Sequence, residues 1–498
     1  MESRRKILAR AAKGPYMIEP FVMRFVRTGL LVSLILGAAI DRSEARAQAG
    51  PGLTIQKNVA VGTKKCDVVT WTDANGKPRS VAFVRADGDH AKFVGGYVQR
   101  YTYYVGDALK TGLAWDAGQE NVSGLGCAVN HHKTASTSKA NSTDATTGFV
   151  FEGANHCLWR FRSKYSGPGT TLGLTIDWFI SQGRNDILWS VSYDSTGQPT
   201  FNWDARGPYF QFDWDGDGKF YEGPISGIRW GDHYKFKTTT FGGAGSAWDY
   251  SQPNVIPYMA LHKDAALGNV EAGVIQTQPW TAQDAGGYWW AQKNWGKTGT
   301  GMMENWNCPF QLNAYEGYSS EKMAWGTNFG YVGNPAYNRL DNKPQVGAPH
   351  QGYSTYILLN KFSDGLTEAM VASMEAVQKT AFTATKGSVT ASGPRHAGLA
   401  GDAPYQPAGW NHVHGTWSVD LDSNAAAVNF AVETGTLLRP LVVFNNYLAA
   451  KAPSLTLNGA ALAEGKEVAV SLDPAAKKVW VTLFKDLSGT SNVLSLKP

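Results

Sequence analysis

Five short clusters in this sequence combine side chains that exchange protons with polar neighbours. Histidine, tyrosine and carboxylic acids are the usual general acids and bases of enzymes. The clusters are Asp232-His233-Tyr234, Glu304-Asn305-Trp306, Tyr315-Glu316-Gly317-Tyr318, His350-Gln351-Gly352-Tyr353 and Asn411-His412-Val413-His414. Most single Tyr or His residues are structural, so the clusters indicate regions of interest rather than proven catalytic residues.

These side chains suit two ways of cleaving a polysaccharide. A β-eliminating lyase needs a base at sugar C5, an acid for the leaving oxygen and a group that stabilises charge on the uronate carboxylate. The residues of those types are His233, Tyr234, Asn305 and Tyr318. A glycoside hydrolase needs two carboxylates roughly 5–5.5 Å or 6.5–9.5 Å apart, and the candidates are Glu304, Glu316, Asp232 and Asp249. Sequence gives no distances, so both reactions stay open.

An acidic loop with the sequence Asp213-Trp-Asp215-Gly-Asp217-Gly218 has the composition of a calcium site. Carboxylates at alternate positions, with a glycine that permits a sharp turn, can surround Ca²⁺ with oxygen ligands. Glu222 follows closely and could add a ligand, but Pro224 stands where an EF-hand would have its final glutamate. We therefore predict a structural calcium site outside an EF-hand, with an acidic surface turn as the alternative.

Tryptophan is concentrated in the middle of the chain. Ten of the 18 tryptophans lie between Trp203 and Trp325, mixed with Asn, Gln, Tyr and Gly. Indole rings stack on the apolar face of a pyranose while neighbouring polar groups bind its hydroxyls. The predicted sugar-stacking residues are Trp230, Trp248, Trp289, Trp290, Trp295 and Trp306. The alternative is that these rings fill a wide β-sandwich core.

The N-terminus has the pattern of a secretory signal peptide. Arg24 and Arg27 precede the apolar run 28–40, and Ala47-Gln48-Ala49 supplies a cleavage site before Gly50. Without residues 1–49 the chain has 46 − 9 = 37 basic and 41 − 4 = 37 acidic residues. A neutral mature protein is not predicted to bind nucleic acid through a global field, and no later segment is predicted to span a membrane.

The four cysteines predict disulfide bonds rather than a metal site. Cys66, Cys127, Cys157 and Cys308 form no C-x-x-C pair. In an oxidising compartment one or two disulfides are expected, with Cys127–Cys157 as the preferred pairing. The sequence also lacks a G-x-S-x-G nucleophile elbow, an H-E-x-x-H motif and a P-loop.

The remaining pattern predicts a mainly β protein. Two β-rich runs, 175–180 and 187–193, flank a polar turn, and similar runs are 81–85, 97–105, 273–278 and 353–359. A helix is expected from Asp364 to Thr380 because Leu366, Met370, Met374 and Val377 repeat at helical spacing. Strands are also expected at 441–444, 454–457, 468–472, 479–484 and 493–496. The predicted organisation is signal peptide 1–49, main β-sandwich catalytic region 50–384, linker and connecting strands 385–438, and C-terminal β-module 439–498.

The segment SQGRNDILWSVSYD, the Trp-rich middle and the C-terminal hairpin carry a resemblance. With these features the chain resembles secreted bacterial polysaccharide-degrading proteins of the galactose-mutarotase-like supersandwich type. The resemblance implies a large β-sandwich domain with a small C-terminal sandwich module, and such folds host both lyases and hydrolases. The expected function is a secreted enzyme that depolymerises an extracellular polysaccharide or oligosaccharide, with a lyase preferred over a glycoside hydrolase. A non-catalytic carbohydrate-binding or envelope protein is the alternative from another class. The expected active cleft lies within 203–353.

Overall fold

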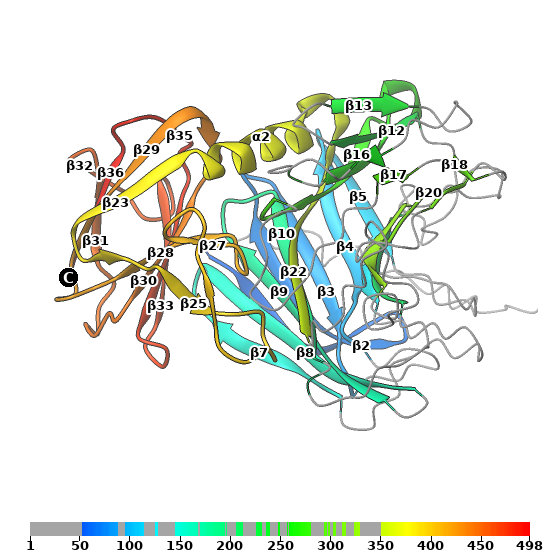
Figure 1. Ribbon diagram of the computed structural model, residues 1–498, viewed down its shortest axis with the longest axis horizontal. Helices are drawn as coiled ribbons and strands as arrows, with labels where there is room; N and C mark the ends of the chain where they lie inside the picture. Colours follow the sequence, from blue (N-terminus) through cyan, green and yellow to red (C-terminus); the bar gives the residue numbers. More distant parts are fainter. Residues whose placement is uncertain are drawn as a thin grey trace, which may run out of the picture. The chain divides into compact units, whose positions relative to one another are not determined.

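The computed structural model describes residues 52–87, 95–113, 125–127, 145–167, 170–194, 196, 206–212, 226–231, 236–239, 248–249, 256, 258–279, 293–295, 297–298, 302–304, 311–314, 323–328 and 350–498. Within these ranges the chain is almost entirely antiparallel β-sheet with a single α-helix (Figure 1). The sheets form sandwich-like arrangements, which confirms the predicted mainly β fold class. The predicted signal peptide lies outside these ranges and stays a prediction.

In the part of the chain that the structure describes, no helix combines the length and apolar character needed to cross a bilayer.

The first sheet has eleven strands, in the order β1-β2-β3-β4-β6-β11-β21-β20-β19-β18, with β5 paired to β4. It is built largely from the N-terminal part of the described chain. The bounds are Thr54–Val61 (β1), Lys64–Thr72 (β2), Pro78–Val84 (β3), Val98–Val105 (β4), Ala108–Leu113 (β5), Leu125–Cys127 (β6), Arg206–Phe212 (β11), Lys297–Thr298 (β18), Met302–Glu304 (β19), Gln311–Ala314 (β20) and Met323–Asn328 (β21).

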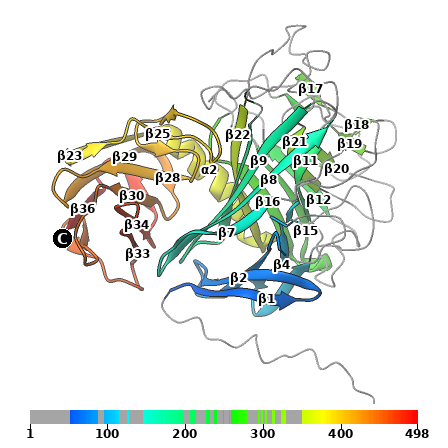
Figure 2. The same cartoon turned by 90° about the horizontal axis from the view of Figure 1, so that it is seen from below.

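The second sheet has nine strands, in the order β13-β12-β15-β16-β22-β10-β9-β8-β7. Its long strands β7, β8 and β9 run side by side in both views (Figures 1 and 2). The bounds are Thr146–Glu152 (β7), His156–Gly167 (β8), Thr170–Ser181 (β9), Asp186–Asp194 (β10), Gly227–Gly231 (β12), Phe236–Thr239 (β13), Tyr258–Lys263 (β15), Val270–Gln276 (β16) and His350–Lys361 (β22). The predicted hairpin around 181–186 is confirmed as β9–β10. A separate pair joins Trp248–Asp249 (β14) to Lys293–Trp295 (β17).

Aromatic side chains fill the space between these two sheets. Phe83 of β3 stacks on Trp159 of β8, with ring centroids 4.8 Å apart, and lies 5.5 Å from Trp178 of β9. Trp71 and Trp189 are also fully buried. Rings of this size bury a large apolar area and pack edge-to-face or offset. These four tryptophans therefore serve the core rather than a sugar site.

Arg79 of β3 joins the two sheets by a buried polar network. Its Nε donates to Asp73 Oδ2 at 2.9 Å, and its Nη1 and Nη2 donate to the Leu359 carbonyl at 2.7 Å and Asn360 Oδ1 at 3.0 Å. Both members of the ion pair are only 2% exposed. A buried guanidinium is tolerated because its N–H groups find acceptors.

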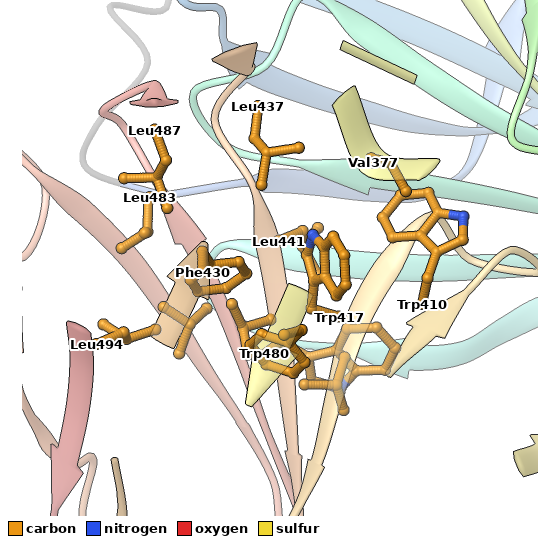
Figure 3. Close-up of a cluster of buried hydrophobic side chains, with 14 of the residues drawn as sticks. Val377, Trp410, Trp417, Phe430, Leu437, Leu441, Trp480, Leu483, Leu487 and Leu494 are labelled. Atoms are coloured by element: carbon orange, nitrogen blue, oxygen red, sulfur yellow. The ribbon is translucent and has the colours of Figure 1, made fainter. Parts of the chain in front are cut away.

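The C-terminal unit is a second sandwich with a dense apolar core. One sheet has the order β23-β29-β36-β31-β32, with β35 beside β29, and the other has the order β24-β28-β30-β34-β33, with β27 beside β28. Figure 3 shows Trp417, Phe430, Leu441, Trp480 and Leu483 within this core. The bounds are Thr380–Lys386 (β23), Ser388–Val389 (β24), Ser392–Pro394 (β25), Asp402–Pro404 (β26), Trp410–Asn411 (β27), Thr416–Asp420 (β28), Ala426–Leu437 (β29), Leu441–Asn445 (β30), Ser454–Leu457 (β31), Ala460–Ala461 (β32), Val468–Asp473 (β33), Lys478–Leu483 (β34), Leu487–Gly489 (β35) and Val493–Lys497 (β36).

The predicted helix is confirmed as α2, Leu366–Gln378, after a short 3-10 turn at Phe362–Asp364. Another 3-10 turn spans Ala265–Leu267. The helix buries Met370, Met374 and Val377, the residues whose spacing predicted it, in the same core cluster as β29.

The segment 385–438, predicted as a linker and connecting strands, contains strands of the C-terminal sandwich. β28 and β29 contribute to the two sheets of the C-terminal sandwich, and β25 pairs with β26. Small residues here permit close packing rather than flexibility. Gly393, for example, lies against Tyr405, where a Cβ would collide with the phenol. The domain boundaries themselves stay predictions.

His156 of β8 forms buried hydrogen bonds with strands of the C-terminal unit. Its Nδ1 lies 2.9 Å from Ser471 Oγ and its Nε2 lies 2.8 Å from Thr482 Oγ1, while Ser181 Oγ also approaches Thr482 Oγ1 at 2.5 Å. The ring is fully buried, and burial lowers the pKa of His156 to about 3. The imidazole is therefore neutral in the folded protein at neutral pH.

We expect this buried imidazole to make stability depend on pH. Burial lowers its pKa to about 3 in the folded protein, against an ordinary value of 6.5, so between these two pH values the unfolded state binds one more proton. Its contribution is complete above about pH 6.5 and declines at roughly 1.4 kcal/mol per pH unit as pH falls toward 3. Denaturant unfolding of the wild type and His156→Gln across this window measures the effect. The variant should show a slope smaller by about one proton; equal slopes would contradict the assignment.

The preferred disulfide pairing is wrong in this structure. Cys157 is a free thiol, as is Cys66, and both are buried. Cys157 lies in β8 of the nine-stranded sheet, whereas Cys127 ends β6 of the eleven-stranded sheet. Burial raises the pKa of both described thiols, which makes them apolar core residues rather than reactive groups.

Candidate functional site

One face of the nine-stranded sheet is aromatic, and part of its other face is polar. On β8, Trp159 and Phe161 point into the core, so Arg160, Arg162 and Lys164 lie on the opposite side because side chains alternate along a strand. The pairing register places Thr175 opposite Arg162, Asp177 opposite Arg160, and Ser192 opposite Thr175. Polar residues of three adjacent strands therefore share one surface, which we call the polar face.

A pocket of about 290 Å³ opens on the polar face. Side chains and backbone from β7 to β10 line it, and one loop residue of the C-terminal unit completes the wall. The lining residues are Thr146, Arg162, Ser163, Lys164, Gly173, Leu174, Thr175, Ser192, Asp194 and Gly398. Two of them are cations and one is a carboxylate, and Thr146 and Thr175 add hydroxyl groups, so a ligand with charged and polar groups would find partners in the pocket.

The charged side chains of the pocket differ in their hydrogen-bond partners. Arg162 and Lys164 are exposed. Among the residues that the structure describes, the Arg162 side chain has no hydrogen bond or ion pair. Asp194 is partly exposed and accepts a hydrogen bond from the Thr196 N–H at 2.9 Å. An exposed guanidinium with five unused donors is prepared for an incoming acceptor.

The loop between β25 and β26 forms part of the pocket wall at Gly398. Ser192 Oγ donates to the Ala397 carbonyl. Gly398 has φ +90°, and a Cβ there would lie 2.8 Å from Thr175 Oγ1. Glycine is required because a side chain would be strained in this conformation and would collide with the sheet.

His414 lies beside Asp177 on the same polar face. Arg160 Nε and Nη2 donate to the two Asp177 oxygens at 2.6 and 2.8 Å, and His414 Nε2 is 4.0 Å from Asp177 Oδ2. Asp177 is 3% exposed, whereas His414 is 22% exposed, although its Nε2 atom is buried. The imidazole therefore has one nitrogen facing a carboxylate and an edge that solvent reaches.

Three side chains of the main sandwich fix the turn that carries His414, between β27 and β28. Thr277 Oγ1 donates to the His412 carbonyl at 2.6 Å, Ser354 Oγ donates to the Val413 carbonyl at 2.8 Å, and Tyr356 Oη donates to the Gly415 carbonyl at 3.2 Å. Buried hydrogen bonds to three nearby carbonyls hold this turn in one position.

The surroundings shift the pKa values of both groups downward. For Asp177, burial would raise the pKa, but the Arg160 guanidinium and the nearby His414 outweigh it and hold the pKa below its ordinary value. For His414, burial lowers the pKa, Asp177 opposes this change, and Lys478 and Arg160 add to it. At neutral pH the pair is therefore an ionised carboxylate beside a neutral imidazole.

One of the five predicted proton-transfer clusters contributes a side chain to this face, and the strand that carries a second cluster pairs with β10. His414 belongs to the cluster at 411–414. The other cluster is at 350–353, where the register pairs His350 with Asp194 and Gly352 with Ser192. His414 lies outside the segment 203–353 in which the active cleft was expected. That segment's own cleft stays a prediction.

The remaining predicted site residues are described only as backbone or lie outside the described residues. Trp248 pairs with Trp295, Asp249 with Lys293, Glu304 with Asn313, and Trp230 with Met259. The residues outside are His233, Tyr234, Asn305, Tyr318, Glu316, Asp232, Trp289, Trp290, Trp306 and the proposed calcium ligands Asp213, Asp215, Asp217 and Glu222. Their roles stay predictions.

Sequence reasoning missed Arg162, Lys164 and Asp177. The signal was present in β8, where HCLWRFRSKYSG alternates apolar residues with Arg160, Arg162 and Lys164. Period-two alternation predicts one polar sheet face. It does not show that this face contains a pocket.

The comparisons with known proteins give little further identification. No protein-family model matches the sequence, and no curated protein matches it. Among solved structures, the galactosidase domain of the alpha-galactosidase–sucrose kinase AgaSK is similar, with 10% identity and a TM-score of 0.34 over 65% of this chain. The chain covers 43% of that protein's chain. A similarity at this level carries no information about catalytic residues or substrate.

Proposed function

We propose that this chain is an exported carbohydrate-active enzyme that depolymerises an extracellular polysaccharide by β-elimination. The observation that supports it is the polar face, where His414, held beside Asp177, shares a surface with the Arg162 pocket. Thr175 of the pocket and Asp177 are two residues apart on one strand, which is roughly 6.6 Å. Export is proposed from the predicted signal peptide. N-terminal sequencing of the exported protein should show that the mature chain begins at or near Gly50.

In the proposed reaction, His414 is the base. Its Nε2 faces Asp177, so Nδ1 is the nitrogen that accepts the proton from sugar C5. The electrons of the C5–H bond form the C4=C5 double bond, the C4–O bond breaks, and an acid protonates the leaving oxygen. Arg162 neutralises the charge that grows on the uronate carboxylate, as such reactions require.

Elimination is favoured over hydrolysis by the carboxylates at this site. Among the described residues that line the pocket, Asp194 is the one carboxylate, and Asp177 is paired with Arg160. A hydrolase needs two carboxylates that are free to act on the bond. Here Asp177 orients the His414 imidazole, and the pocket contributes the cations Arg162 and Lys164. A uronate substrate needs a base and a cation for its carboxylate.

Incubation with a panel of acidic and neutral polysaccharides tests the proposal. Unsaturated uronate absorbance together with new reducing ends supports a lyase. Reducing ends alone would replace it by a glycoside hydrolase that uses Glu304 and Asp249, and binding without products would leave a carbohydrate-binding protein.

We also propose that Asp213, Asp215, Asp217 and Glu222 bind a structural Ca²⁺, on the sequence pattern alone. Because a ligand that binds only the folded state stabilises it by mass action, chelation should lower the melting temperature and added calcium should restore it. Asp215→Asn should abolish this response. A melting temperature that is unchanged by chelator and by calcium would remove the site.

A further inference from the structure

The pocket on the polar face has the charge pattern of a subsite for a sugar acid. Arg162 and Lys164 lie two residues apart on β8 and therefore point to the same side. Across the sheet, Asp194 occupies the position next to Gly173, which itself pairs with Lys164. The absence of a side chain at Gly173 leaves space between the Lys164 and Asp194 positions.

An anionic group on the ligand accounts for the cations. Arg162 is exposed and has no partner among the described residues. A guanidinium binds a carboxylate through two parallel N–H bonds, while an ammonium adds a compact charge. Both cations lie on the same side of β8, so one acceptor can contact both.

Hydroxyl groups on the same ligand account for the rest of the lining. Asp194 would repel a simple anion, but a carboxylate accepts hydrogen bonds from sugar hydroxyls. Thr146 and Thr175 supply hydroxyls that donate or accept. A ligand that carries both a carboxylate and hydroxyls fits these groups better than a free inorganic anion or a neutral sugar.

The size of the pocket limits what it holds. About 290 Å³ is at the lower end of ligand pockets, which run roughly from 300 to 1,000 Å³. It therefore accommodates about one sugar unit, and a longer chain would continue over the polar face.

We propose that this pocket is a subsite for one carboxylate-bearing sugar unit, in which Arg162 and Lys164 bind the carboxylate while Asp194 and Thr175 bind hydroxyls. The inference rests on the proposed function for the polymeric nature of the ligand and names its class, an acidic glycan. Gly398 of the C-terminal unit forms part of the wall, so that unit contributes to substrate recognition.

Binding measured apart from cleavage tests this subsite. The probes are short oligogalacturonates and oligomannuronates, with neutral galactose and mannose oligomers as counterparts, titrated calorimetrically against wild type, Arg162→Gln, Lys164→Gln and Lys485→Gln. Lys485 is an exposed lysine of the C-terminal unit and controls for the change in net charge. Melting curves confirm that each variant is folded.

We expect wild type and Lys485→Gln to bind an acidic series more tightly than its neutral counterpart. Each pocket variant should bind it about tenfold to a hundredfold more weakly, as loss of a charged hydrogen bond does. Equal affinity in folded Arg162→Gln and wild type, preference for neutral sugars, or no binding of either acidic series would overturn the subsite. Binding that depends on Arg162 without any cleavage would instead retain the subsite and reject the lyase.

Discussion

His414→Gln is expected to lower turnover on the polysaccharide that the wild type cleaves by about a hundredfold or more, which is the usual effect of losing a general base. Glutamine keeps the size and polarity of the side chain but accepts no proton at neutral pH. The affinity for acidic oligosaccharides should change little, because the carboxylate and hydroxyl contacts of the substrate are assigned to the pocket residues and not to His414. Initial rates and calorimetric binding on the same preparations measure both quantities.

His262→Gln is the matched control for this substitution. His262 lies in β15, three strands from β10 in the sheet order, and stacks on Phe362 with ring centroids 4.1 Å apart. It should keep wild-type turnover. Full activity in folded His414→Gln would contradict the role of His414 as the base.

Asp177→Asn tests the same hypothesis through the pH dependence of the rate. A purely structural role of Asp177 would not shift this dependence. The neutral imidazole is the active base, so activity should fall as pH drops below the pKa of His414. Asp177 raises that pKa against the effect of burial, so its neutralisation should shift the acid limb of the rate profile to lower pH. An unchanged acid limb would show that Asp177 does not affect the pKa of the catalytic base.

Asp73→Ala is expected to destabilise the protein by about 3–5 kcal/mol, the usual cost of leaving a buried charge without its partner. Arg79 is 2% exposed and would lose the carboxylate at 2.9 Å. Asp73 Oδ1 also accepts from the Asn75 and Lys77 N–H groups, so the turn between β2 and β3 loses two bonds. A lower denaturation midpoint at an unchanged m-value measures the loss.

Asp107→Ala is the control for that measurement. Asp107 pairs with Lys77 at 2.7 Å, but it is 98% exposed, and exposed ion pairs contribute little to stability. Its midpoint should match the wild type. An equal midpoint in Asp73→Ala would show that Arg79 does not need its partner.

The sequence predicted those elements whose pattern is local. The two β-rich runs in 175–193, separated by a polar turn, predicted a hairpin, and β9–β10 confirms it. Its apolar side chains, such as Trp178, pack against Phe83 in the core. Helix α2 was visible because the spacing of its core residues leaves no other regular structure. The C-terminal hairpin β33–β34 was predicted from the period-two alternation of its two strands.

The sequence could not predict the polar face, because it depends on pairing between strands far apart in the chain. His414 meets Asp177 only when a turn of the C-terminal unit lies against Ser354 and Thr277. The small-residue segment from about 385 was predicted as a linker with connecting strands, since glycine and proline mark turns. In the fold the same glycines let Tyr405 and Thr175 approach the backbone.

The most direct test of the proposed function is the count of unsaturated uronate ends and of new reducing ends in one digest of an acidic polysaccharide by the wild-type protein. Elimination breaks one C4–O bond and forms one C4=C5 bond for each reducing end. We therefore predict equal numbers of the two ends, and loss of both in His414→Gln. Reducing ends without unsaturated ends, or no cleavage of any acidic polysaccharide, would contradict the account.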